Sequence, residues 1–88
     1  MKISKNFVLR QIAGTWVVLP LGAATTELSG MITLNETGVF LWKILENGAT
    51  REELASALTE EYEVSFDEAL ADIDAFIVKL ENAHCLEN

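Results

Sequence analysis

The stretch Met31-Ile32-Thr33-Leu34-Asn35-Glu36 decides the fold of this chain, because the hydrophobic period of the sequence changes within it. Residues 31–34 form a short run of β type. Asn35 can end that run and cap a helix, and Glu36 just inside the helix complements the helix dipole. Before this stretch the chain reads as strands, and after it as helices. The sequence therefore predicts an α+β fold in which strands precede helices.

Two further strands are expected before this stretch. Residues 7–12 and 15–19 are rich in β-forming residues and flank Ala13-Gly14, a plausible two-residue turn, so they predict a hairpin. Pro20 suits the end of the second strand, and a glycine-containing loop follows it. Residues 31–34 supply a third strand, whose edge is open to pairing with another chain.

Three helices follow, each with sequence signals at its start or its end. Gly38, in the first turn of the first helix, removes a side chain where the helix start meets the sheet. Thr50-Arg51-Glu52-Glu53 and Ser65-Phe66-Asp67-Glu68 both read as capping boxes, and Gly48 stands where a helix-terminating glycine belongs. The expected helices cover about residues 36–47, 51–62 and 66–84. The main apolar stripe of the third helix comprises Ala69, Leu70, Ile73, Phe76, Ile77 and Leu80.

The expected order, β-β-β-α-α-α, describes a winged helix-turn-helix-like domain: a three-stranded antiparallel sheet followed by three helices that cover one of its faces. The length of 88 residues suits a single domain over residues 1–88 with a small core. No apolar run approaches the roughly 18 residues of a membrane span, and the N-terminal residues lack the features of a signal peptide. The single cysteine, Cys85, excludes an internal disulfide framework. We therefore expect a cytoplasmic protein without membrane contact.

The charge of the chain is unevenly distributed. Residues 1–34 carry three cations and one acid, a net charge of +2, whereas residues 35–88 carry three cations and thirteen acids, a net charge of −10. A helical half this acidic repels phosphate backbones, because nucleic-acid affinity depends on lysine and arginine neutralising phosphates. The simpler interpretation is that these acids keep a small domain in solution. The charge still argues against a nucleic-acid partner.

The sequence predicts no catalytic residue, no metal site and no cofactor. His84 and Cys85 are adjacent and diverge by about 100° on a helix, and no further His or Cys exists to complete a metal site or a nucleophile–base pair. Three carboxylate clusters lie outside any EF-hand pattern: Glu60-Glu61, Asp67-Glu68 and Asp72 with Asp74. Solvated helix surface explains these clusters better than a cation site does. The pattern indicates a recognition module and not an enzyme.

An ordered set of residues resembles the PqqD family, whose small proteins act in pyrroloquinoline quinone biosynthesis. Its central block is Ile32-Thr33-Leu34-Asn35-Glu36-Thr37-Gly38. The N-terminal part, Leu9-Arg10 through Trp16-Val17-Val18-Leu19-Pro20, also fits the first hairpin of the family, so the resemblance covers nearly the whole chain. The later matching positions are Phe40, Trp42, Leu45, Gly48, Thr50, Glu53, Leu54, Leu58, Glu61-Tyr62, Val64, Asp72, Phe76, Leu80 and Leu86. No single motif decides the resemblance, but the ordered spacings are fairly specific.

The resemblance implies a precursor-peptide recognition element for ribosomally synthesised, post-translationally modified peptides. The leader of the precursor would add as a strand to the third β-strand, in a groove closed by the third helix. The protein would then present the peptide to a modifying enzyme, such as a radical SAM protein, and act as a peptide chaperone without chemistry of its own. Carried over to this chain, the strand edge comprises Gly30, Met31, Ile32, Thr33 and Leu34, and the helical wall lies near Asp72, Phe76 and Lys79.

A second apolar line on the third helix flanks its main stripe. Ala71, Ala75 and Val78 are spaced i, i+4, i+7, and our hypothesis is that they line the groove, where small side chains admit those of the leader. The alternative is that alanine is simply a strong helix former on an exposed face. Asp72 likewise has two interpretations. It could bind a basic leader residue or a peptide N–H, or it could be a solvated surface acid.

Three rival functions stay open. A winged-helix regulator of DNA would need a basic recognition helix, whereas acids crowd the second and third helices. A carrier protein would need an attachment serine at a helix start, but Ser29 precedes a strand. A homodimeric acidic scaffold would use the same strand edge to pair with itself, in competition with a leader peptide.

Overall fold

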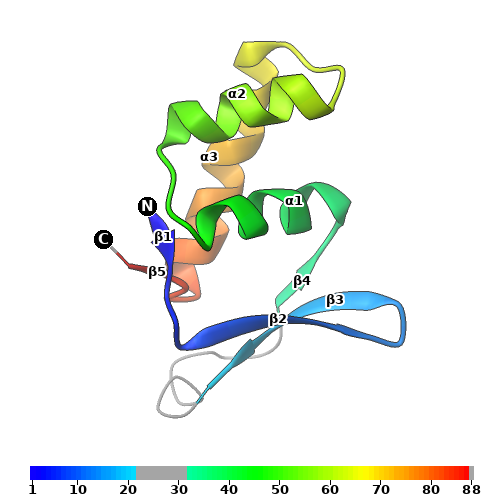
Figure 1. Ribbon diagram of the computed structural model, residues 1–88, viewed down its shortest axis with the longest axis vertical. Coiled ribbons are helices and arrows are strands. Elements are labelled where there is room, and N and C mark those ends of the chain that lie inside the picture. Colours follow the sequence, from blue (N-terminus) through cyan, green and yellow to red (C-terminus); the bar gives the residue numbers. More distant parts are fainter. Residues whose placement is uncertain (22–31, 88) are drawn as a thin grey trace.

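The computed structural model describes residues 1–21 and 32–87, and its fold is α+β and winged helix-turn-helix-like (Figure 1). Its strands are β1 (Lys2–Ile3), β2 (Phe7–Ile12), β3 (Thr15–Pro20), β4 (Ile32–Leu34) and β5 (Leu86–Glu87). Its helices are α1 (Glu36–Leu45), α2 (Arg51–Glu61) and α3 (Phe66–Asn82). Strands β2, β3 and β4 form a three-stranded antiparallel sheet in that order. All three helices lie on the same side of this sheet (Figure 1).

The hairpin of β2 and β3 is confirmed, together with its two-residue turn. Ala13 and Gly14 have φ angles of 52° and 82°. Two successive positive φ values are what a type I′ turn requires, and this turn matches the natural twist of paired strands. In the register of the sheet, Val17 of β3 lies opposite Thr33 of β4. The central strand β3 thus holds β4 at the edge of the sheet.

The third expected strand forms in part within the described residues, and the two ends of the chain form an additional strand pair. Residues Ile32–Leu34 form β4, whereas Gly30 and Met31, which belong to the predicted strand edge, lie outside the described residues. The pairing of β1 with β5, in which Lys2–Ile3 meets Leu86–Glu87, is absent from the sequence prediction. Strands of two residues have no hydrophobic period to detect. Figure 1 shows β1 and β5 side by side.

The first two helix caps form as expected. The Asn35 side chain accepts a hydrogen bond from the Gly38 N–H at 2.8 Å at the start of α1. At the start of α2 the capping box is complete, because Thr50 N donates to Glu53 Oε1 at 2.8 Å and Glu53 N donates to Thr50 Oγ1 at 3.1 Å. These bonds satisfy N–H groups that have no partner inside a helix.

The capping box expected at Ser65 is wrong in part. Glu68 N donates to Ser65 Oγ at 3.1 Å, so the N-cap bond exists. The Glu68 carboxylate, however, accepts from the Ser65 hydroxyl at 3.0 Å instead of from the Ser65 main chain. A serine hydroxyl can donate and accept at once, and here it uses both capacities on one residue. The start of α3 therefore lacks the reciprocal bond that completes a capping box.

Each helix ends slightly earlier than expected. Helix α1 ends at Leu45, α2 at Glu61 and α3 at Asn82. Two residues beyond helix ends adopt positive φ, Gly48 at 87° and His84 at 60°. Such left-handed residues turn the chain away from a helix axis, and glycine does so without steric cost.

The core lies between the helices and one face of the sheet. The expected stripe of α3 is confirmed, since Ala69, Ile73, Phe76 and Leu80 are buried and Leu70 and Ile77 pack against the core. The Trp42 side chain of α1 is fully buried, which makes it a core tryptophan. A Cβ added to Gly38 would lie 3.3 Å from both Asn35 Oδ1 and Leu34 Cβ. The missing side chain therefore lets α1 start directly against β4.

Candidate functional site

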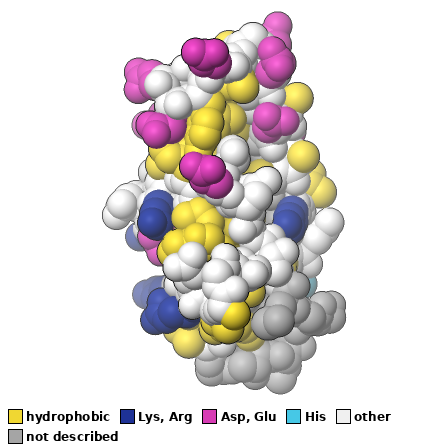
Figure 2. Space-filling model, turned by 90° about the vertical axis from the view of Figure 1, so that its right-hand side faces the viewer, with side chains coloured by type: hydrophobic (Ala, Val, Ile, Leu, Met, Phe, Trp, Pro, Cys, Tyr) yellow, Lys and Arg dark blue, Asp and Glu magenta, His cyan; other side chains and the backbone are white. Residues whose placement is uncertain are grey.

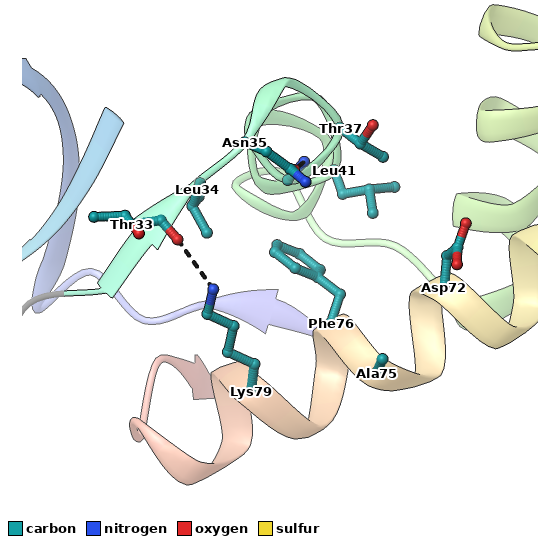
Figure 3. A pocket seen from close by; sticks show the side chains of 10 residues that line it. Thr33, Leu34, Asn35, Thr37, Leu41, Asp72, Ala75, Phe76 and Lys79 are labelled. Atoms are coloured by element: carbon teal, nitrogen blue, oxygen red, sulfur yellow. Dashed lines mark hydrogen bonds between the residues drawn. The ribbon is translucent and has the colours of Figure 1, made fainter. Parts of the chain in front are cut away.

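A cavity of about 520 Å³ opens between β4, the start of α1 and the middle of α3 (Figure 3). Each wall comes from a different element, and the charged lining side chains both belong to α3. The lining residues are Thr33, Leu34, Asn35, Thr37, Gly38, Leu41, Asp72, Ala75, Phe76 and Lys79. A sheet edge, a helix start and a helix face thus meet around one hollow.

The strand wall of the cavity carries open main-chain groups. Strand β4 is the edge of the sheet, and Thr33 is exposed. The ammonium of Lys79 donates to the Thr33 carbonyl oxygen at 3.0 Å, and it reaches that oxygen from α3, on the side away from β3 (Figure 3). In an antiparallel pair, the N–H and C=O of one residue point together, either to the partner strand or away from it. The Thr33 main chain therefore faces the cavity.

The helical wall is one face of α3. Asp72, Phe76 and Lys79 follow at spacings of four and three residues, which places them in a row along the helix. Phe76 is buried and forms the apolar floor, whereas Asp72 and Lys79 are exposed. These two charged residues lie two helical turns apart, a rise of about 11 Å. The wall thus has an apolar centre with an acid toward one end and a cation toward the other.

The structure brings together six of the predicted site residues in this cavity: Thr33, Leu34, Asp72, Ala75, Phe76 and Lys79. It does not bring in the others that it describes. Ile32 packs against the core, and Ala71 and Val78 are exposed side chains outside the cavity lining. Our hypothesis of an Ala71, Ala75 and Val78 line therefore matches the geometry at Ala75 alone. Which of these residues contact a ligand stays a prediction.

Four lining residues are missing from the predicted site: Asn35, Thr37, Gly38 and Leu41. Asn35 caps α1, and the other three residues lie within α1, so the predicted site lacks the whole wall that this helix forms. Gly38 is the residue from which this wall could have been predicted. The sequence indicated a close approach of the helix start to the sheet there, and a helix start that touches an edge strand also borders whatever lies beside that edge.

Two features bear on whether the described residues form a reactive site: the thiol of Cys85 and the placement of the possible metal ligands. Burial raises the pKa of the Cys85 thiol to about 11, and its Sγ lies 3.7 Å from the Ala83 carbonyl oxygen, so it is poorly suited to act as a nucleophile. Within residues 1–21 and 32–87, no group of three or more His, Cys, Asp or Glu side chains is arranged to hold a metal ion. Among the same residues, no helix combines the length and the apolar character needed to cross a membrane.

Comparison with known proteins identifies the family. Residues 15–86 match the family described as coenzyme PQQ synthesis protein D (PqqD). The chain belongs to the PqqD family. No curated protein matches the sequence significantly. The expected PqqD resemblance is thus confirmed over most of the chain, including all elements that line the cavity.

Two solved structures are similar to this PqqD-family protein. One is TbiB1 in complex with the TbiA(beta) leader peptide, with 31% sequence identity and a TM-score of 0.79, and the match covers 100% of this chain and 96% of TbiB1. The other is a lasso peptide synthetase B1 complexed with its leader peptide, with 26% identity and a TM-score of 0.71. That match covers 91% of this chain and 88% of the other. Both neighbours are small proteins solved with a bound leader peptide.

Proposed function

We propose that this protein binds the leader of a ribosomally made precursor peptide as a strand added to β4, and presents it to a modifying enzyme. The observation that carries the proposal is the main chain of Thr33, which faces a cavity whose opposite wall is α3. Strand addition gains affinity from main-chain hydrogen bonds and specificity from pockets for alternate side chains. The open edge of β4 supplies the main-chain groups, and the hollow beside Phe76 supplies a pocket for side chains.

The solved neighbours support this function. Both TbiB1 and the lasso peptide synthetase B1 were solved with leader peptides, and both resemble this protein over nearly its full length. The length of the site also suits a short extended peptide. An extended peptide rises about 3.3 Å per residue, so the stretch between Asp72 and Lys79 accommodates three to four residues of a leader. A short recognition motif would fill it.

The modifying enzyme is the second part of the proposal. Membership of the PqqD family favours a radical SAM enzyme, as the sequence resemblance implied. The similarity to a lasso peptide synthetase B1 favours a lasso precursor as a second candidate cargo. In either case the protein acts as a peptide chaperone and leaves the chemistry to its partner. We infer a cytoplasmic location, which the free thiol of Cys85 favours.

A DNA-binding function has less support. In a winged helix-turn-helix regulator a helix enters the major groove and needs basic residues on its exposed face. On α2 and α3 the exposed charges are mostly acids, including Glu60, Glu61, Asp67 and Glu68. Figure 2 shows one face of the molecule, where acidic side chains gather over the upper part and the lysine and arginine side chains lie lower. This distribution repels a phosphate backbone at the helices.

The experiment that tests the proposal is a titration of the ¹⁵N-labelled protein with synthetic leader peptides of the precursors encoded beside its gene. Saturable shifts at the amides of Thr33, Leu34, Ala75 and Lys79 are expected, with slowed hydrogen exchange at Thr33. A scrambled leader of the same composition is the control. Shifts with duplex DNA instead of leaders would favour the regulator. A doubled molecular mass in the absence of peptide, together with slowed hydrogen exchange at the Thr33 amide, would favour the homodimeric scaffold.

A further inference from the structure

We propose that Lys79 selects leader peptides that carry an acidic side chain at one fixed position. In the free protein the Lys79 ammonium holds the Thr33 carbonyl oxygen, and on binding it passes to a carboxylate of the leader. This inference rests on the proposed function and specifies the chemistry of the peptide. The bond between Lys79 and Thr33 joins two residues 46 positions apart in the chain (Figure 3).

An incoming strand and Lys79 compete for the same atom. Thr33 is the central residue of β4, and its N–H and C=O face the cavity, whereas the main-chain groups of Ile32 and Leu34 alternate toward β3. An added strand must therefore donate one of its N–H groups to the Thr33 oxygen. The ammonium at 3.0 Å from that oxygen lies where this N–H group would approach. Binding requires Lys79 to move aside.

Lys79 can move because its bond is exposed to solvent. Both Lys79 and Thr33 are exposed residues, so water can replace the bond as it breaks. The long, flexible lysine stem also lets the ammonium swing while α3 stays in place. The Lys79 bond is therefore a reversible cover over the strand edge and not part of the core.

The displaced ammonium needs a new partner, and among the described residues Lys79 takes part in no ion pair. The ion pairs recorded between described residues join Arg51 to Glu52 and to Asp74. Asp72, the other charged residue of the cavity, lies two helical turns away, about 11 Å along α3. A carboxylate brought by the leader would replace the bond between the ammonium and a neutral carbonyl with one in which the donor and the acceptor both carry a charge.

The alternation of a strand fixes the position of that carboxylate. Successive side chains of an added strand point to opposite faces of the sheet. The side chain of Thr33 lies on the face opposite to Leu34, which is buried toward the helices. The leader residue opposite Thr33 therefore points away from α3, and its immediate neighbours point toward α3. Of these two neighbours, the one near Lys79 is expected to be Asp or Glu. The one near Asp72 is expected not to be acidic.

The test is a selection of random dodecapeptides displayed on phage against three immobilised proteins: the wild type, Lys79→Glu and Lys43→Glu. Lys43 is the matched control. It lies on α1 with its ammonium 5.4 Å from the centre of the Trp16 ring, outside the cavity lining, and its substitution changes the net charge by the same amount. Both variants replace exposed side chains, and their ¹H–¹⁵N spectra verify the fold.

The expected result is an Asp or Glu at one fixed position of the peptides selected by the wild type and by Lys43→Glu. The same peptides bind Lys79→Glu about tenfold or more weakly, in line with the loss of a close charge pair. Lys79→Glu instead selects Lys or Arg at that position. Peptides that shift the Thr33 amide but show no acidic preference, or that lose affinity equally for both variants, would overturn the role of Lys79 and leave peptide binding intact. Failure to enrich any peptide would overturn both.

Discussion

Arg51 at the start of α2 and Asp74 on α3 join through two parallel hydrogen bonds. Arg51 Nε lies 2.6 Å from Asp74 Oδ1, and a terminal nitrogen lies 2.8 Å from Oδ2. This two-point geometry is the strongest form of an arginine–carboxylate contact. It connects the two helices across 23 residues and lies on the exposed surface of the protein. Its contribution to stability should therefore be measurable and sensitive to pH.

We expect Asp74→Asn to lower the stability of the protein at neutral pH and to have little effect in acid. The hydrogen bonds and charge of Arg51 lower the pKa of Asp74 in the folded state. The resulting stabilisation is present above the unfolded pKa, which is about 3.9, and is lost as the pH falls through the lower folded value. Urea unfolding of both proteins between neutral pH and strong acid measures the difference. A constant difference across that range would contradict the prediction.

Ala75→Arg should weaken leader binding about tenfold or more without unfolding the protein. Ala75 is exposed and lines the cavity, so an arginine there fills space that a peptide side chain would occupy. Ala71→Arg is the matched control, because Ala71 is an exposed alanine of the same helix outside the cavity lining. Calorimetric titration with a leader peptide compares the two. Equal effects of both substitutions would show that the added charge, and not the cavity, governs binding.

Substitutions at the N-caps of α1 and α2 can distinguish effects on stability from effects on leader binding. Asn35→Ala and Thr50→Ala each remove an N-cap bond and should each cost about 1 kcal/mol of stability. Asn35 lines the cavity and Thr50 does not, so we expect only Asn35→Ala to weaken leader binding as well. Urea unfolding gives the stability of each variant and calorimetry its affinity. Weakened binding in Thr50→Ala would mean that overall stability limits the affinity.

Cys85 should resist thiol reagents in the folded protein. At pH 8, a thiol with its pKa raised to about 11 is ionised in about one molecule in a thousand, and Cys85 is also fully buried. An unfolded thiol ionises near pH 8.5 while the folded one keeps its proton, so Cys85 should lower the stability progressively as the pH rises from about 8.5 toward 11. Cys85→Ala should remove this dependence. The rate of iodoacetamide labelling with and without urea tests the first point, and alkaline unfolding curves test the second.

The sequence predicted the parts of the fold that local signals determine. The change of period at Leu34-Asn35, the turn at Ala13-Gly14 and the cap at Thr50 each depend on a few neighbouring residues, and each is confirmed. The pairing of β1 with β5 depends on residues at opposite ends of the chain. Two-residue strands carry no pattern of their own, so their pairing follows from the packing of everything between them.

The candidate site was predictable only in part, for the same reason. Periodicity identified two apolar lines on α3, but the way that α3 crosses β4 decides that Ala75 lines the cavity while Ala71 and Val78 do not. The contact between Lys79 and Thr33 was beyond sequence reasoning, since a long side chain can reach many acceptors and its choice depends on the final arrangement. The family resemblance pointed to Asp72, Phe76 and Lys79, and all three line the cavity.

The three described residues of β4, Ile32–Leu34, bear on how fast a leader bound as proposed would dissociate. In the described part of this strand, only Thr33 turns its main chain to the open edge, so few backbone bonds hold a bound strand there. Differences in affinity between related complexes arise mostly in the dissociation rate. We therefore expect a leader bound as proposed to dissociate quickly, so that one molecule of the protein can serve many precursor molecules in succession.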